Sequence, residues 1–316
     1  MSSVTTDPPS PGMEWIPGGT FRMGSDYNYP EEKPATAATV EGFWMDPTAV
    51  TNREFAAFVD ATGYVTVAEK APDPAMYPGA DPALLVPGSI TFNQPSGPVD
   101  LSNPMLWWAW TPGACWREPW GPGSDLQGRE DHPVTQVCFQ DADAYARWAG
   151  KSLPTEAQWE RAARGGIEDA EFAWGSELAP GGDERMNRWI GRFPWEYRPK
   201  TDGPRQPGTV PVRSFGANGF NLFEMTGNTW EWTRTWFEEG HADSSKACCA
   251  PRDPQIPGVD ASRDPATGIP RKVLKGGSFL CAENYCSRYR PAARIPETIE
   301  SATCHISFRC VSPMPT

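Results

Sequence analysis

The sequence has little of what marks several large classes of protein. It has only 3 His in 316 residues, and its 28 Lys and Arg are outnumbered by 40 Asp and Glu, which gives a net charge of −12. An acidic chain lacks the positive surface that nucleic acid needs. No apolar run approaches the roughly 20 residues that span a bilayer. We therefore expect no nucleic-acid partner and no membrane partner.

Familiar catalytic and metal-binding motifs are also missing. The sequence has no GxSxG, no P-loop and no GxGxxG after a strand, so serine hydrolase and nucleotide chemistry have no local support. The histidines, His132, His241 and His305, are too scattered for a histidine-based iron site. Zinc would need paired CxxC or Cys/His spacing, which does not occur. The lack of a fixed repeat argues against a solenoid or propeller.

What the chain does contain is typical of a globular, turn-rich protein. Its hydrophobic content is 39%, with 15 Trp, 35 Pro and 30 Gly, which favours a packed core and few long helices. Residues 1–12 are rich in Ser, Thr and Pro and have no signal-peptide pattern, so they predict a disordered leader. We expect a single domain over 13–316 and a cytoplasmic location, where cysteines stay reduced.

Local patterns predict a few short elements. Capping boxes at 51–54 and 155–158 predict helices that end at Gly63 and Gly165, and Asp141 is expected to cap a third helix that ends before Gly150. Short strands are predicted at 19–23, 39–44, 133–139 and 272–275. Residues 64–131 and 233–270 are predicted as long irregular loops, which a bound metal would tether.

The stretch KGGSFLCAENYCSRYR at 275–290 carries the most chemistry. Cys281 and Cys286 would point to different faces of a straight helix or strand, so a shared site requires a turn between them. Two soft thiolates with no further ligand suit Cu(I). Arg288 and Arg290 would favour the thiolate forms. The spacing alone favours the alternatives, which are buried structural cysteines or one local disulfide.

A second cluster, NLFEMTGNTWEWT at 221–233, alternates oxygen-bearing side chains with small residues. Calcium prefers six to eight oxygen ligands in a loose cage, which such a segment can supply. The alternative is a Trp-rich turn whose acids are solvated. The residues alone leave both interpretations open.

Taken together, these motifs resemble a known family, the formylglycine-generating enzymes or sulfatase-modifying factors. The resemblance runs in order from about residue 13 to residue 311, and its most specific part is Gly-Gly-Ser-x-x-Cys-x-x-x-x-Cys-x-Arg-Tyr-Arg at 276–290. The other matching segments are IPGGTFRMGS at 16–25, VTNREF at 50–55, DHPV at 131–134, WAGKSLPTEAQWE at 148–160, GNTWEW at 227–232 and FRC at 308–310.

The resemblance implies both a fold and a reaction. The fold would be α+β with little regular secondary structure, related to C-type lectins. The reaction would be copper-dependent aerobic oxidation of a cysteine, within a Cys-x-Pro-x-Arg motif of an unfolded or nascent client protein such as a sulfatase, to Cα-formylglycine. Oxidation at the client Cβ would give a thioaldehyde, and water would convert it to the aldehyde.

The resemblance also assigns residues. Cys281 and Cys286 would bind Cu(I), and Ser278 and Trp230 would lie beside the metal as active-site residues. Structural calcium would be held at two positions. The ligands implied for the first are Asn187, Arg188, Asp202 and Pro204, and those for the second are Glu224, Gly227, Thr229 and Glu231.

Three positions depart from the family pattern around this site: Ala282, His305 and Ser307. They bear on rate and client preference more than on copper binding.

Two other functions stay open, a non-catalytic binding module of the same fold and a copper thiol oxidase with another substrate. An ergothioneine-type sulfoxide synthase would need a helical domain and clustered histidines, and the sequence has neither.

Overall fold

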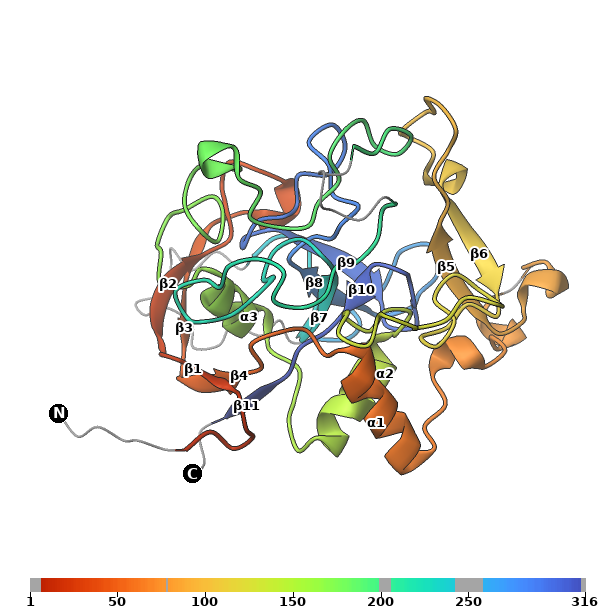
Figure 1. The fold of residues 1–316 in the computed structure, drawn as a ribbon, viewed down its shortest axis with the longest axis horizontal. Coiled ribbons are helices and arrows are strands. Elements are labelled where there is room, and N and C mark those ends of the chain that lie inside the picture. Colours follow the sequence, from red (N-terminus) through yellow and green to blue (C-terminus); the bar gives the residue numbers. More distant parts are fainter. Residues whose placement is uncertain (1–6, 78, 199–205, 242–257, 314–316) are drawn as a thin grey trace.

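Short helices and small sheets, joined by long connections, make up the fold (Figure 1). The computed structural model describes residues 7–77, 79–198, 206–241 and 258–313. Its α-helices are α1 (Asn52–Thr62), α2 (Phe139–Trp148) and α3 (Glu156–Ala163). Its strands are β1 (Glu14–Ile16), β2 (Gly19–Met23), β3 (Thr36–Val40), β4 (Phe43–Met45), β5 (Gly88–Phe92), β6 (Trp108–Pro112), β7 (Trp230–Trp236), β8 (Arg271–Lys275), β9 (Arg294–Thr298), β10 (Ile306–Ser307) and β11 (Val311–Pro313). This is the α+β fold with little regular structure that the sequence predicts.

A four-stranded sheet lies at the centre, in the order β10-β7-β8-β9. Strand β10 runs parallel to β7, and the other neighbours are antiparallel. Helix α3 lies between this sheet and the β2–β3 hairpin, as Figure 1 shows. In a smaller sheet, β1 and β11 flank β4, so segments from both ends of the described chain pair with the same strand.

Two predicted helices are confirmed together with their caps. The Thr51 hydroxyl accepts a hydrogen bond from the Glu54 amide at 3.3 Å, and the Glu54 carboxylate accepts one from the Thr51 amide at 2.8 Å. Gly63, with φ of 67°, ends α1 in the left-handed conformation that glycine adopts without strain. Thr155 and Gln158 form the same reciprocal pair at the start of α3.

The predicted cap of the remaining helix is wrong by three residues. Helix α2 begins at Phe139 with Cys138 as its N-cap, and Asp141 is the third helical residue. The Asp141 carboxylate accepts a hydrogen bond from the Cys138 amide at 2.9 Å, so it satisfies a free amide from inside the first turn. It also accepts one from the Val67 amide at 3.0 Å, a long-range contact that the local pattern could not reveal.

Some predicted strands and loops also need correction. Residues 133–139 do not form a strand, because Gln136 has φ of 60° and its amide bonds to the Thr303 carbonyl. The run 39–44 divides into the end of β3 and the start of β4. The predicted loop 64–131 contains the β5–β6 hairpin, and the predicted loop 233–270 begins inside β7. Of the predicted leader, residues 7–12 form bends and a turn, whereas 1–6 lie outside the described residues.

The largest core cluster lies where α1 and α2 pack together beside the central sheet. Phe55 stacks on Tyr145 at 6.0 Å between ring centroids and meets Trp116 edge-on at 5.1 Å. A second cluster surrounds Trp159 of α3 between the β2–β3 hairpin and β4.

Among the described residues, no helix is long and apolar enough to cross a membrane.

Buried ion pairs connect the segments that the short elements leave apart. Arg309 donates to both oxygens of Glu231 at 2.8 Å, and Trp159 Nε1 donates to the same carboxylate at 2.7 Å. Arg309 and Glu231 are at most 1% exposed. Removing one partner of such a pair leaves an uncompensated buried charge, which costs far more than the pair itself contributes.

We expect Arg309→Met to lower the free energy of unfolding by about 3–5 kcal/mol, because Glu231 would stay buried without its cation. Urea unfolding followed by circular dichroism measures this change. Arg53→Met is the matched control, since Arg53 pairs with Asp131 on the surface and such pairs contribute about 0–1 kcal/mol. Equal effects of the two substitutions would contradict the argument. The double variant Arg309→Met/Glu231→Met should recover part of the loss.

Candidate active site

The site is built on the turns that follow β8. Gly277 has φ of 73°, and a Cβ there would lie 2.8 Å from the Arg288 carbonyl oxygen, so only glycine fits. The Cys281 amide bonds to the Ser278 carbonyl at 3.0 Å, and the Cys286 amide bonds to the Ala282 carbonyl at 2.8 Å. The chain therefore turns between the two cysteines, as a shared site requires.

These turns bring the two thiols into contact. Cys281 Sγ lies 3.4 Å from Cys286 Sγ, and both cysteines are free. Cys281 is buried, and its sulfur accepts a hydrogen bond from the Ser278 amide at 3.4 Å. Cys286 is half-buried. One sulfur is thus enclosed by protein, and the other lies nearer to solvent.

The surroundings shift the pKa values of the two cysteines in opposite directions. The hydrogen bond from the Cys281 thiol and the nearby charge of Arg288 lower the pKa of Cys286 to about 6. Burial raises the pKa of Cys281 well above its usual value, and the hydrogen bond to Cys286 raises it further. At neutral pH the pair therefore holds one thiolate, on Cys286, and one thiol.

A segment from the N-terminal part of the chain completes the surroundings of Cys286. Arg288 Nη1 points to Cys286 Sγ at 3.8 Å, while its Nε and Nη2 donate to Glu31 Oε1 at 2.9 and 2.7 Å. The Tyr29 hydroxyl accepts from the Ser287 amide at 3.1 Å. The sequence interpretation missed Tyr29 and Glu31, and no local motif marks them.

An aromatic cluster packs beside the cysteine turns. Tyr285, which lies between the cysteines in sequence, stacks on Phe193 with ring centroids 4.8 Å apart and meets Trp107 edge-on at 5.5 Å. The Asn284 amide group bonds to the backbone N–H and C=O of Phe193, each at 3.1 Å. The turn is therefore held against a rigid apolar surface.

The two further predicted active-site residues are buried near the pair. The Ser278 hydroxyl accepts from the Leu280 amide at 3.2 Å and is fully buried, while the Ser278 amide contacts Cys281. Trp230, at the start of β7, belongs to the same core cluster as Cys281. Its amide donates to the His305 carbonyl at 2.9 Å. Ser278 is therefore adjacent to the sulfur pair, and Trp230 lies in the surrounding core.

The carboxylates of the second predicted calcium position already accept hydrogen bonds within the protein. Both oxygens of Glu231 already accept hydrogen bonds from Arg309. The Glu224 carboxylate accepts from the backbone amides of Arg213 and Phe215 at 2.9 and 3.0 Å. Both carboxylates thus have donors within the protein, and a calcium ion at Glu224, Gly227, Thr229 and Glu231 stays a prediction.

The first predicted calcium position is only half within the described residues. Asp202 and Pro204 lie outside them. Asn187 Nδ2 donates to the Gly208 carbonyl at 2.9 Å, and Arg188 pairs with Glu184 and Glu283 through its side chain. A calcium ion at Asn187 and Arg188 therefore stays a prediction.

The three departures from the family pattern have distinct surroundings. Ala282 is fully buried in the aromatic cluster. His305 Nδ1 lies 2.8 Å from the Thr303 hydroxyl, and burial lowers the pKa of His305 to about 3, so the ring is neutral. Ser307 Oγ is buried and has no hydrogen-bond partner among the described residues.

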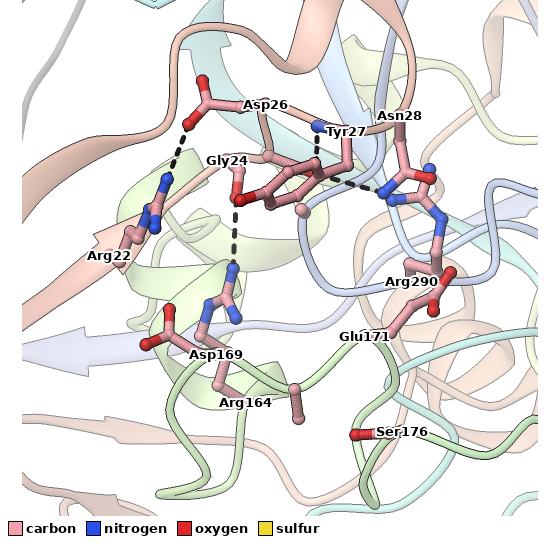
Figure 2. Close-up of a pocket in the computed structure, with 13 residues that line it drawn as sticks. Arg22, Gly24, Asp26, Tyr27, Asn28, Arg164, Asp169, Glu171, Ser176 and Arg290 are labelled. Atoms are coloured by element: carbon pink, nitrogen blue, oxygen red, sulfur yellow. Dashed lines mark hydrogen bonds and ion pairs between the residues drawn. The ribbon is translucent and has the colours of Figure 1, made fainter.

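A cavity of about 510 Å³ is lined by residues of the loop after β2, by Arg164 and by Arg290 (Figure 2). Each of its arginines is already paired: Arg22 with Asp26 at 2.6 Å, Arg164 with Glu160 at 2.7 Å and Arg290 with Glu32 at 2.6 Å. It therefore offers no uncompensated cation to an anionic ligand.

The donor set at the cysteines suits one kind of metal. Within the described ranges, no group of three or more His, Cys, Asp and Glu side chains gathers as a metal site. Cys281 and Cys286 thus provide two soft sulfurs without a third such ligand. Zinc prefers four ligands, whereas Cu(I) accepts low coordination by sulfur. The pair therefore fits Cu(I).

Comparison with known proteins agrees with this fold. The family model for the sulfatase-modifying factor enzyme 1-like domain matches residues 2–314. A formylglycine-generating enzyme of Mycobacterium tuberculosis is 52% identical over 300 residues, covering 94% of this chain and 96% of the relative. One of Thermomonospora curvata is 45% identical over 308 residues, covering 95% and 93%. PvdO from Pseudomonas aeruginosa shares the fold, with a TM-score of 0.61 at 18% identity over 96% of this chain and 94% of that one.

The fold and the matched domain show that the chain is a protein of the sulfatase-modifying-factor class. Within that class, the chain belongs to the formylglycine-generating enzyme family.

We expect the metal-free protein to show a thiolate titration with a midpoint near pH 6, because the pKa of Cys286 is lowered to about 6. Absorbance at 240 nm follows the thiolate as pH rises. Cys286→Ser should abolish the step. Cys281→Ala and Arg288→Gln should each move its midpoint to higher pH, since each removes a cause of the lowered pKa. A midpoint above pH 8 in the unsubstituted protein would contradict the assignment.

Proposed function

We propose that the protein oxidises a cysteine of a client protein to Cα-formylglycine, using Cu(I) bound by Cys281 and Cys286 and O₂ as oxidant. The client would be a sulfatase whose cysteine lies in an unfolded or nascent Cys-x-Pro-x-Arg segment. The observation that carries the proposal is the pair of free sulfurs 3.4 Å apart on the turns that follow β8. Similarity to formylglycine-generating enzymes over nearly the whole chain supports the same reaction.

The two cysteines have different tasks in this proposal. Cys281 is enclosed, and the Ser278 amide fixes its sulfur from one side, so it serves as the permanent anchor. Cys286 is half-buried, which leaves its side of the pair open to an incoming client thiol. A Cu(I) ion held by Cys281 and Cys286 would supply the redox chemistry between the client thiolate and O₂.

The surrounding side chains control access. Tyr285, Phe193 and Trp107 form an apolar wall beside the pair, which limits the water that reaches the sulfurs. Trp230 and Ser278 complete the buried side. The overall change replaces the client CH₂–SH by CHO, releases the sulfur as H₂S and reduces O₂ to water, with an added thiol supplying two electrons and two protons from solution.

Mass spectrometry of a Cys-x-Pro-x-Arg peptide tests the proposal. The peptide is incubated in air with copper-loaded protein and excess thiol reductant, and we expect loss of sulfur and gain of an aldehyde that a hydroxylamine probe captures. Cys281→Ser and Cys286→Ser should each reduce turnover by at least about 100-fold, because each removes half of the metal-binding sulfur. Cys115→Ser is the matched control, since Cys115 is a buried thiol outside the site and should leave turnover unchanged.

The other outcomes distinguish the alternatives. A protein that binds Cu(I) tightly but leaves this peptide intact would favour a copper thiol oxidase with another substrate. A protein that binds no Cu(I), or binds it equally well in both cysteine variants, would favour a non-catalytic binding module of the same fold.

A further inference from the structure

One edge of the Arg288 guanidinium donates to Glu31, and the other edge faces the sulfur pair. Its Nε and Nη2 donate to a single oxygen of Glu31 at 2.9 and 2.7 Å. Its Nη1 lies 3.8 Å from Cys286 Sγ. The planar fork thus has a fixed direction, with one N–H group aimed at the half-buried sulfur.

Tyr29 supports the same orientation from the face of the guanidinium. The central carbon of Arg288 lies 3.6 Å from the centroid of the Tyr29 ring, a close cation–π contact. The Tyr29 hydroxyl holds the Ser287 amide, which precedes Arg288 in the chain. Two residues from the loop between β2 and β3 therefore fix both the backbone and the side chain at this point.

The neighbouring arginine makes a useful contrast. Arg290 forms a two-bond pair with Glu32 at 2.6 and 2.9 Å, and its Nε donates to the Ser287 carbonyl. It is 2% exposed, and no contact with either sulfur occurs among the described residues. Of these two arginines, Arg288 alone contacts a sulfur, although the sequence pattern treats them alike.

We propose that Arg288 stabilises negative charge on the Cys281–Cys286 pair, and that Tyr29 and Glu31 are positioning residues that hold it there. Two thiolates with one Cu(I) carry a net negative charge, and a client thiolate would add another, so a cation at the solvent side of the pair favours both states. The copper part of this inference rests on the function proposed above. The contact between Arg288 Nη1 and Cys286 Sγ, at 3.8 Å, does not.

Two equilibria, measured in the full-length protein and in its Arg288→Gln variant, test the role of Arg288. The first is Cu(I) affinity, measured by competition with a chromophoric chelator. The second needs no metal: the dithiol and oxidised glutathione exchange to the Cys281–Cys286 disulfide and two reduced glutathiones, and peptide mapping counts the products. We expect about tenfold weaker Cu(I) binding and about tenfold more disulfide at a given glutathione ratio, because lost stabilisation of the anionic sulfurs affects both.

A double-mutant cycle tests the positioning residues. Tyr29→Leu should weaken Cu(I) binding about threefold, whereas Tyr29→Phe keeps the ring and should have less effect. In an Arg288→Gln background, Tyr29→Leu should have no further effect, because it acts through Arg288. Equal effects in both backgrounds would show a merely structural role and overturn this part. If circular dichroism shows that Arg288→Gln does not fold, the two Tyr29 variants decide. A larger loss of Cu(I) affinity in Tyr29→Leu than in Tyr29→Phe supports the inference, and equal losses overturn it.

Matched controls separate the possible failures. Arg53→Gln removes a surface arginine that pairs with Asp131 and should change neither equilibrium. Folded Arg288→Gln with both equilibria unchanged would overturn the inference. If the unsubstituted protein binds no Cu(I), the proposed function fails, and the glutathione equilibrium alone then supports or overturns the role of Arg288.

Discussion

A charged side chain buried in a protein needs an oppositely charged partner. In this fold, such buried ion pairs connect segments that the short helices and strands do not hold together. Arg294 donates to both oxygens of Glu156 at 2.7 and 3.0 Å, and Lys275 reaches Glu160 at 3.0 Å, all four being fully or almost fully buried. Burial alone would raise the pKa of Glu156, but the charge of Arg294 lowers it overall, so the carboxylate stays ionised. These pairs tie α3 to β8 and β9.

The cysteine site depends on the same network. Lys275 is the last residue of β8, and the chain enters the glycine turn directly after it. Its pairing with Glu160 therefore anchors the strand from which Cys281 and Cys286 are presented. On the far side of the turn, Arg290 is held by Glu32. The sulfurs thus lie on a loop whose two ends are fixed by buried ion pairs, which explains how a segment without regular structure maintains a defined geometry.

Backbone hydrogen bonds also anchor the long connections. The β5–β6 hairpin is bonded to residues 302–304 through the backbone of Ile90. Glu231, which the resemblance implies as a calcium ligand, accepts hydrogen bonds from both Arg309 and Trp159. Its role as a calcium ligand stays a prediction.

The sequence by itself determined the features that depend on neighbours in the chain. The capping boxes at Thr51 and Thr155 follow from hydrogen bonds over three residues. The spacing of Cys281 and Cys286 requires a turn between them if both enter one site. Tyr29 was missed, and the contact of Asp141 with Val67 was not foreseen, because these partners are remote in sequence. Tyr29 and Ser287 are 258 residues apart. Only the tertiary structure decided which arginine faces the sulfurs and which carboxylate is already paired, because burial and long-range contact set the energy of a charge, and a local pattern contains neither.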